Sequence, residues 1–311
     1  MLDKHIAAML EQARATGAPD LADLPPVPCR ALYRQILAAA DVPPADVGSE
    51  DRSIDRADGA AIPVRIYTPH AAANGGVIVY YHGGGYVLGD LDGYDNLCRR
   101  LCADSGSTVV SVDYRLAPEH PFPAAVDDAW DALRWVAANA SVLGVDGQRI
   151  AVAGDSAGAA LAAAVCLLAR DAGGPHLAAQ GLVYPPAAGN HAGDYPSRET
   201  HAAGPTLTAR SMDYFSRHFF GPGAKAPDFR GAPLLAASLA GLPPALVMVA
   251  GLDALRDEAM AYAQALAAAG NDATVVEYHS LPHGFLSMGA VPAARLGQLQ
   301  LAQFLAQRLA A

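Results

Sequence analysis

From about residue 62 onward, short apolar runs alternate with longer segments in which apolar positions recur at helical spacing. Most of the short runs lack polar alternation, which is typical of strands buried on both faces. The expected strands are 64–67, 76–81, 108–112, 150–153, 181–184, 245–250 and 274–278, and the expected helices are 93–104, 124–139, 157–171, 255–269 and 293–309. This order predicts an α/β fold with a mostly parallel central sheet and helices on both faces.

Two parts of the chain lie outside this alternation. The first fifty residues contain two helical patterns, at 3–16 and 29–40, separated by a proline-bearing stretch. Between the strands that end at Tyr184 and begin at Ala245 lie about sixty residues, which is too long for an ordinary connection. We therefore expect an appended helical layer and an insertion.

The clearest element of the insertion is a helix that begins after Thr208, a plausible N-cap. Met212, Phe215 and Phe219 are spaced as one face of that helix. This face fits packing in a core or the lining of a substrate pocket, and the sequence favours core packing slightly.

Composition limits the class of protein and its partners. The chain has 311 residues, of which 52% are hydrophobic and 17% charged, as expected of a folded protein with a buried sheet. A net charge of −10 and the lack of a long basic run argue against nucleic acid as a partner.

The sequence also bears on location. We expect the scattered cysteines to be reduced core residues, and they are Cys29, Cys98, Cys102 and Cys166. The first residues lack the apolar region of a signal peptide, and prolines interrupt the longest uncharged stretch, at 234–252. These features predict a cytoplasmic protein without stable membrane insertion.

The strongest chemical signal is the pentapeptide GDSAG at 154–158, which follows an expected strand and precedes an alanine-rich helix. In a sharp strand-to-helix turn, the flanking glycines allow a close approach of the two elements, and the serine hydroxyl is exposed over the edge of the sheet. We therefore expect Ser156 to be a nucleophile.

A serine nucleophile needs a base, and in this arrangement an acid and then a histidine follow it along the chain. Asp253 comes directly after the strand at 245–250, and His283 follows the strand at 274–278. Asp257 and Glu258 are better explained as acids in the first turn of a helix, where the helix dipole favours them. We therefore expect Asp253 to be the acid and His283 the base.

A glycine-rich segment, YYHGGGY at 80–86, ends another apolar strand. It lacks the spacing of a phosphate-binding loop, and its backbone N–H groups could bind a developing oxyanion. The N–H of Ala157 is the other expected donor. His279 and His283 lie four residues apart, but Pro282 argues against a helical zinc site. We expect neither a metal nor a cofactor.

Together these motifs resemble those of the bacterial hormone-sensitive-lipase-like esterases, also called family IV lipolytic enzymes. The resemblance runs from about residue 62 to the C-terminus, and the N-terminal helices are similar to the family's cap. It rests on HGGG at 82–85, DYRLAPEHPFPAA at 113–125, GDSAG at 154–158, DALRDE at 253–258 and HGF at 283–285.

The resemblance implies an α/β-hydrolase fold with an eight-stranded sheet, a triad of Ser156, Asp253 and His283, and a helical cap. It implies that Gly84 and Gly85 form the oxyanion hole with Ala157, and that Gly83 is mainly a turn glycine. The implied division is cap at 1–50 and 187–225, and hydrolase core at 51–186 and 226–311.

The implied activity is hydrolysis of small carboxylic esters with short to medium acyl chains through an acyl-enzyme on Ser156. An amidase, deacetylase or lactonase would use the same residues, so these activities stay open. A ligand-binding receptor of the same fold is disfavoured because His283 is present. The sequence is compatible with a homodimer and leaves the oligomeric state open.

Overall fold

The computed structural model describes residues 1–17, 19–56, 59–70 and 74–310. Within these ranges, eight strands form one sheet in the order β1-β2-β4-β3-β5-β6-β7-β8. The strands are β1 (Gly48–Asp55), β2 (Ala61–Thr68), β3 (Val77–Tyr81), β4 (Thr108–Val112), β5 (Ile150–Asp155), β6 (Ala179–Val183), β7 (Ala245–Leu252) and β8 (Ala273–Pro282). The β1–β2 and β2–β4 pairs are antiparallel and all the others are parallel.

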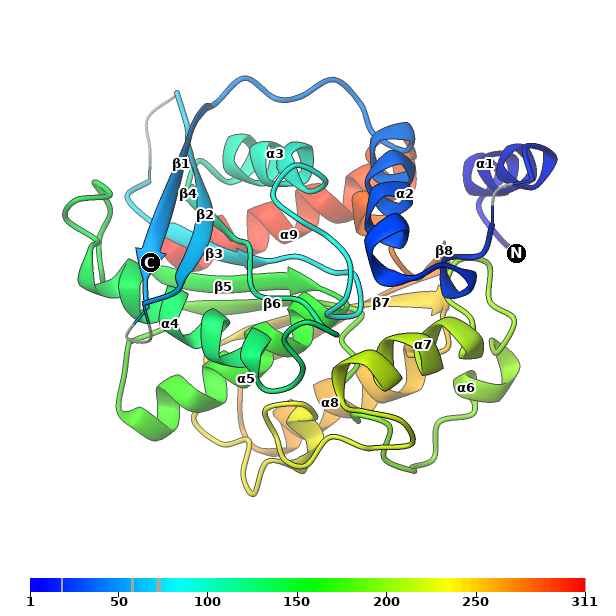
Figure 1. Ribbon diagram of the computed structural model, residues 1–311. Coiled ribbons are helices and arrows are strands. Elements are labelled where there is room, and N and C mark those ends of the chain that lie inside the picture. The colour runs from blue at the N-terminus through cyan, green and yellow to red at the C-terminus, as the bar shows by residue number, and fades with distance from the viewer. Residues whose placement is uncertain (18, 57–58, 71–73, 311) are drawn as a thin grey trace.

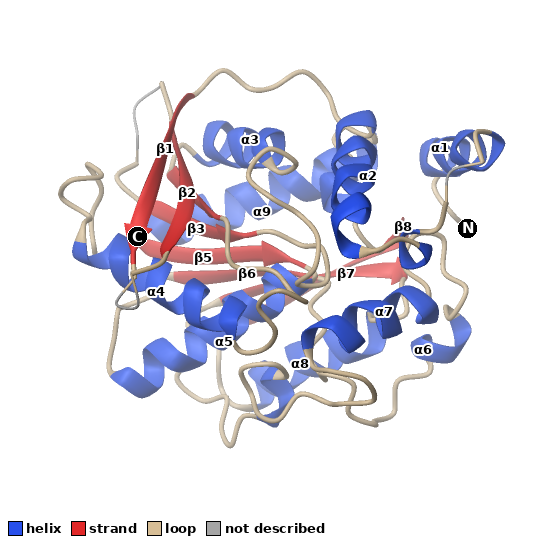
Figure 2. Cartoon of the chain, in the orientation of Figure 1, coloured by secondary structure: helices blue, strands red, loops and turns tan. Residues whose placement is uncertain are grey.

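Helices cover both faces of the sheet (Figure 2). Alternate side chains of each strand point to opposite faces. In β3, Val79 belongs to the core under α4 (Ala124–Ala138), α5 (Ala157–Ala172) and α8 (Arg256–Ala268), whereas Ile78 packs under α3 (Asp95–Ser105) and α9 (Pro292–Ala310). The predicted fold class, a mostly parallel sheet between two helical layers, is confirmed.

All seven strands expected from the sequence are present, with ends shifted by a few residues. The central strands β3, β4 and β6 are buried along their whole length, which explains their unbroken apolar runs. The eighth strand, β1, was not among the runs singled out from the sequence. Its residues read GSEDRSID and are mostly exposed at the edge of the sheet, so an apolar run could not reveal it.

In the part of the chain that the structure describes, four α-helices lie outside these layers, at the C-terminal ends of the parallel strands: α1 (Lys4–Ala15), α2 (Pro26–Ala39), α6 (Ser197–Thr200) and α7 (Ala209–Phe219). Figure 1 shows α2 and α7 on either side of the ends of β6 and β7. Tyr214 of α7 donates a hydrogen bond to the carbonyl of Leu24, 3.1 Å away, just before α2. The N-terminal helices and the insertion, far apart in sequence, therefore meet.

The insertion helix begins as expected. The Thr208 hydroxyl accepts a hydrogen bond from the Ser211 backbone N–H at 3.1 Å, so Thr208 is its N-cap. The four cysteines are free and buried, as predicted. In the ranges given above, no helix is long and apolar enough to cross a membrane.

Candidate active site

Ser156 occupies a strained turn between β5 and α5. Its φ of 53° is unusual for a residue with a side chain. A Cβ at Gly158 would lie 1.9 Å from the carbonyl oxygen of Tyr81, and a Cβ at Gly154 would lie 2.4 Å from the carbonyl carbon of Gly158. Only glycine allows this close approach, so the two flanking glycines make the turn possible.

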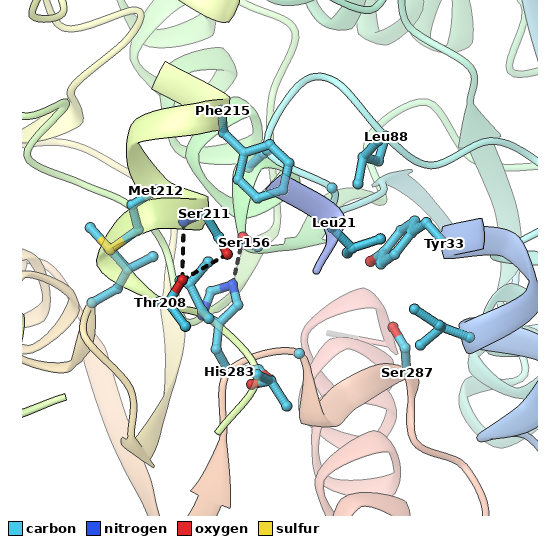
Figure 3. A pocket seen from close by; sticks show the side chains of 18 of the residues that line it. Leu21, Tyr33, Leu88, Ser156, Thr208, Ser211, Met212, Phe215, His283 and Ser287 are labelled. Carbon is cyan, nitrogen blue, oxygen red and sulfur yellow. Dashed lines mark hydrogen bonds between the residues drawn. The ribbon is translucent and has the colours of Figure 1, made fainter. Parts of the chain in front are cut away.

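Ser156, His283 and Asp253 form a continuous hydrogen-bonded row. Ser156 Oγ lies 2.8 Å from His283 Nε2, a contact drawn as a dashed line in Figure 3. His283 Nδ1 lies 2.7 Å from Asp253 Oδ2, and the other oxygen of Asp253 accepts the Leu255 N–H at 3.0 Å. An ionised carboxylate only accepts hydrogen bonds, so Nδ1 carries the proton and Nε2 is left to accept the proton of Ser156.

The topology explains why these side chains meet. Ser156 follows β5, Asp253 follows β7 and His283 follows β8, and the three strands are parallel members of one sheet. Their carboxyl ends therefore lie at one edge, where open α/β sheets place their functional loops. Asp253 and His283 are both buried, which shields their hydrogen bond from water.

The glycine-rich loop lies beside this row because β3 pairs directly with β5, with Tyr81 opposite Gly154. Gly84 and Gly85 have positive φ angles of 116° and 61°. A Cβ at Gly84 would lie 2.2 Å from the Leu88 carbonyl oxygen, so the tight turn requires glycine. Gly84, Gly85 and Ala157 line the same cavity as Ser156.

A buried carboxylate, Asp155, joins this loop to the serine turn. Its Oδ1 accepts hydrogen bonds from the Tyr80 hydroxyl at 2.7 Å and from the Gly83 N–H at 2.9 Å, and its Oδ2 accepts one from Tyr94 at 3.3 Å. Burial raises the pKa of Asp155 to about 6, against the lowering effect of these donors. The sequence alone does not reveal this role of Asp155, because a single acid inside the pentapeptide forms no pattern of its own.

His82, at the start of the loop, supports the backbone. Its Nδ1 lies 2.8 Å from the Gly83 carbonyl oxygen, and its ring stacks on Tyr114 with centroids 4.3 Å apart. Burial lowers the pKa of His82 to about 4, so the ring is neutral at pH 7. A neutral Nδ1–H can donate to Gly83, which gives His82 a structural place in the loop.

A cavity of about 840 Å³ opens over Ser156 between α1, α2 and α7. Figure 3 shows Phe215 and Met212 of α7 on one side, and Leu21 and Tyr33 from the N-terminal segment on the other. Phe219, on the same face of α7, is buried and stacks on Tyr86 with ring centroids 3.8 Å apart. Both interpretations of this face of α7 are therefore correct: it lines the pocket, and it also packs in the core.

Comparison with known proteins agrees with this geometry. Residues 78–287 match the family described as alpha/beta hydrolase fold. This chain belongs to the α/β-hydrolase family. The resemblance drawn from the motifs is thereby confirmed.

Among relatives of this α/β-hydrolase, the esterase LipI of Mycobacterium tuberculosis is 45% identical, with 82% of this chain and 81% of LipI covered. The carboxylic ester hydrolase LipN of the same organism is 44% identical, with 92% and 77% covered. The solved structure of the ester-hydrolase EH1AB1 from the metagenome of Lake Arreo superposes with a TM-score of 0.94 at 37% identity, over 100% of both chains.

Another buried carboxylate of this α/β-hydrolase, Glu258, lines the same cavity. It accepts hydrogen bonds from the Ala188 N–H at 3.0 Å and from Arg198 Nη2 at 2.9 Å. Its neighbour Asp257 accepts the Ser197 N–H at 2.7 Å. Both acids lie in the first turn of α8, as the helix-dipole interpretation expects, but that interpretation missed their links to the insertion.

Burial raises the pKa of Glu258 to about 7, because the loss of hydration outweighs the pairing with Arg198. No cluster of three or more metal-ligating side chains occurs in the part of the chain that the structure describes.

The raised pKa of Glu258 predicts a pH-dependent stability. Between about pH 4.5 and pH 7, the folded protein keeps a proton that the unfolded chain has lost, so stability falls as pH rises. Glu258→Gln removes this dependence. In urea unfolding, the wild type should lose about 2 kcal/mol more than Glu258→Gln between pH 5 and pH 8.

Glu277→Gln is the matched control. Pairing with Arg256 lowers the pKa of Glu277, so its titration lies below pH 5 in both states and the variant should parallel the wild type over this range. Equal pH dependence of Glu258→Gln and wild type would contradict the assignment.

Proposed function

We propose that this protein is a serine carboxylesterase that hydrolyses small carboxylic esters with short to medium acyl chains. The observation that carries the proposal is the row from Ser156 Oγ to His283 Nε2, at 2.8 Å, and from His283 Nδ1 to Asp253, at 2.7 Å. The relatives LipI and LipN are named esterase and carboxylic ester hydrolase, which supports an ester as the substrate class.

In the proposed mechanism, Ser156 Oγ attacks the ester carbonyl as His283 Nε2 takes its proton. Asp253 holds the imidazole and stabilises its positive charge. The backbone N–H groups of the oxyanion hole, from Gly84, Gly85 and Ala157, bind the oxyanion of the tetrahedral intermediate.

Collapse of that intermediate breaks the bond to the alcohol, which leaves with the proton from His283. The acyl group stays on Ser156 as an ester. A water molecule then attacks the acyl carbonyl, and His283 takes its proton. The second tetrahedral intermediate collapses to the carboxylic acid as Ser156 Oγ leaves and takes the proton from His283, so the cycle closes without a cofactor.

We further propose that residues 1–50 and 187–225 act as a helical cap over a core formed by 51–186 and 226–311. This division is supported by α1, α2 and α7, which line the cavity above Ser156. A cytoplasmic location is supported by the four free, buried cysteines. A homodimer stays a prediction of the sequence.

Removal of the nucleophile or the base should abolish turnover. Ser156→Ala and His283→Ala should each lower kcat for p-nitrophenyl butyrate by at least about 10⁴-fold, because neither variant can complete proton transfer and acylation. Circular dichroism should show an unchanged fold. The control is Ser287→Ala, which removes another hydroxyl from the cavity wall and should keep near-normal activity. Near-normal activity in Ser156→Ala or His283→Ala would contradict the assignment.

The cavity predicts a preference for small, dissolved esters. Fats in emulsions need a broad apolar docking surface. In the described residues, the exposed large apolar side chains are few and far apart along the chain, and only Val27 and Ile36 share an element, α2; they are Met1, Val27, Ile36, Val142, Leu235, Val275 and Leu296. In a series of p-nitrophenyl esters, acyl chains of about four to eight carbons should give the highest kcat/KM, well above turnover of emulsified long-chain triglycerides. Comparable rates on both would refute this preference.

A further inference from the structure

A chain of hydroxyl groups connects helix α2 to the carboxylate beside the nucleophile. The Tyr33 hydroxyl lies 3.0 Å from the Tyr94 hydroxyl, which lies 3.3 Å from Asp155 Oδ2. Tyr94 and Asp155 are buried, and Tyr33 is partly buried at the cavity wall (Figure 3). The first hydroxyl of the chain is thus on a helix of the proposed cap, and the last group is in the hydrolase core.

The donor and acceptor capacities of Tyr33, Tyr94 and Asp155 determine the direction of the two hydrogen bonds that join them. Above about pH 7 the Asp155 carboxylate is ionised and can only accept hydrogen bonds. Tyr94 has one hydroxyl proton, and its hydroxyl donates the hydrogen bond that this proton allows to Asp155. Tyr33 must therefore donate to the oxygen of Tyr94, and this bond strengthens the donation from Tyr94 because aligned hydrogen bonds polarise one another.

The other oxygen of Asp155 holds the glycine-rich loop. It accepts the N–H of Gly83 at 2.9 Å, and Gly84, one of the proposed oxyanion donors, is the next residue. Ser156 directly follows Asp155 on the other side. The orientation of this one carboxylate thus sets the position of the loop relative to the nucleophile.

Two arginines attach α2 to the residues that directly follow the glycine-rich loop. Arg30 Nε donates to the Val87 carbonyl at 2.8 Å, and Arg34 Nη2 lies 2.6 Å from Asp90 Oδ2. These contacts hold the helix along residues 87–90, so the Tyr33 hydroxyl stays in reach of Tyr94. From these contacts we propose that Tyr33 is a positioning residue for the oxyanion loop and acts through Tyr94 and Asp155.

This assignment rests on the proposed esterase function. It gives α2 a second role besides lining the pocket. The helix helps to align the oxyanion donors, and a displaced α2 would leave the loop less well ordered. The effect should appear in kcat more than in KM, because oxyanion donors act mainly on the transition state.

The test is Tyr33→Phe, which keeps the ring against the cavity and deletes only the hydroxyl. It should lower kcat for p-nitrophenyl butyrate by about fivefold, with KM changed by less than about twofold. Affinity for a trifluoromethyl ketone, which forms a tetrahedral adduct with an oxyanion, should fall by a similar factor.

Tyr214→Phe is the matched control. It also deletes one tyrosine hydroxyl bond in the proposed cap, the one to the Leu24 carbonyl at 3.1 Å, without a link to Asp155. Its kcat should equal that of the wild type. Tyr94→Phe should lower kcat at least as much as Tyr33→Phe, and the double variant should lose no more than Tyr94→Phe alone, because Tyr33 acts through Tyr94.

Three results would overturn the proposal: wild-type kcat in Tyr33→Phe, the same loss in Tyr214→Phe, or additive losses in the double variant. The outcome is separable from that of the esterase assignment. If the wild type lacks esterase activity, or Ser156→Ala retains it, the proposed function fails. If activity depends on Ser156 but not on the Tyr33 hydroxyl, only the positioning role fails.

Discussion

The buried carboxylate of Asp155 is the point at which the parts of the site are held together. A buried carboxylate is costly unless hydrogen-bond donors surround it, and the donors here come from β3, the glycine-rich loop and α3's preceding turn. These donors can satisfy the carboxylate only when the loop lies against the end of β5. The position of the loop is therefore tied to the residue that precedes Ser156.

The backbone crossing beside it imposes a second constraint. Gly158 lies so near the carbonyl of Tyr81 that no side chain fits, and Ser156 adopts a positive φ in the turn between β5 and α5. Such a conformation persists only where the surrounding structure holds it, and here the buried strands β3 and β5 do so. Parallel pairing then places Asp253 and His283, which follow β7 and β8, at the same edge of the sheet as Ser156. There His283 lies within hydrogen-bond distance of both Ser156 and Asp253.

The sequence was sufficient to predict the parts of this arrangement that produce local patterns. Buried parallel strands leave apolar runs, and Ser156, Asp253 and His283 each follow such a run, so their order could be read directly. The edge strand β1 left no such signal because most of its side chains face water. Its pairing with β2 depends on the fold of the whole sheet.

Polar contacts between residues far apart in the chain could not be predicted from the sequence either. Glu258 could be placed in the first turn of a helix, but Arg198 lies in α6, the short helix of the insertion, and neither residue indicates the other in the sequence. In the same way, nothing near Tyr33 points to Tyr94, which lies on the far side of the glycine-rich loop in sequence. Such pairs form only when the helices outside the sheet are placed over its edge.

The proposed chemistry depends on Ser156 Oγ as the nucleophile that becomes acylated. The most direct measurement is labelling with a p-nitrophenyl alkylphosphonate, followed by peptide mass spectrometry. We expect release of one p-nitrophenolate per chain and a single phosphonyl group on Ser156, with no labelling of Ser156→Ala. A label on another residue, or equal labelling of Ser156→Ala, would contradict it.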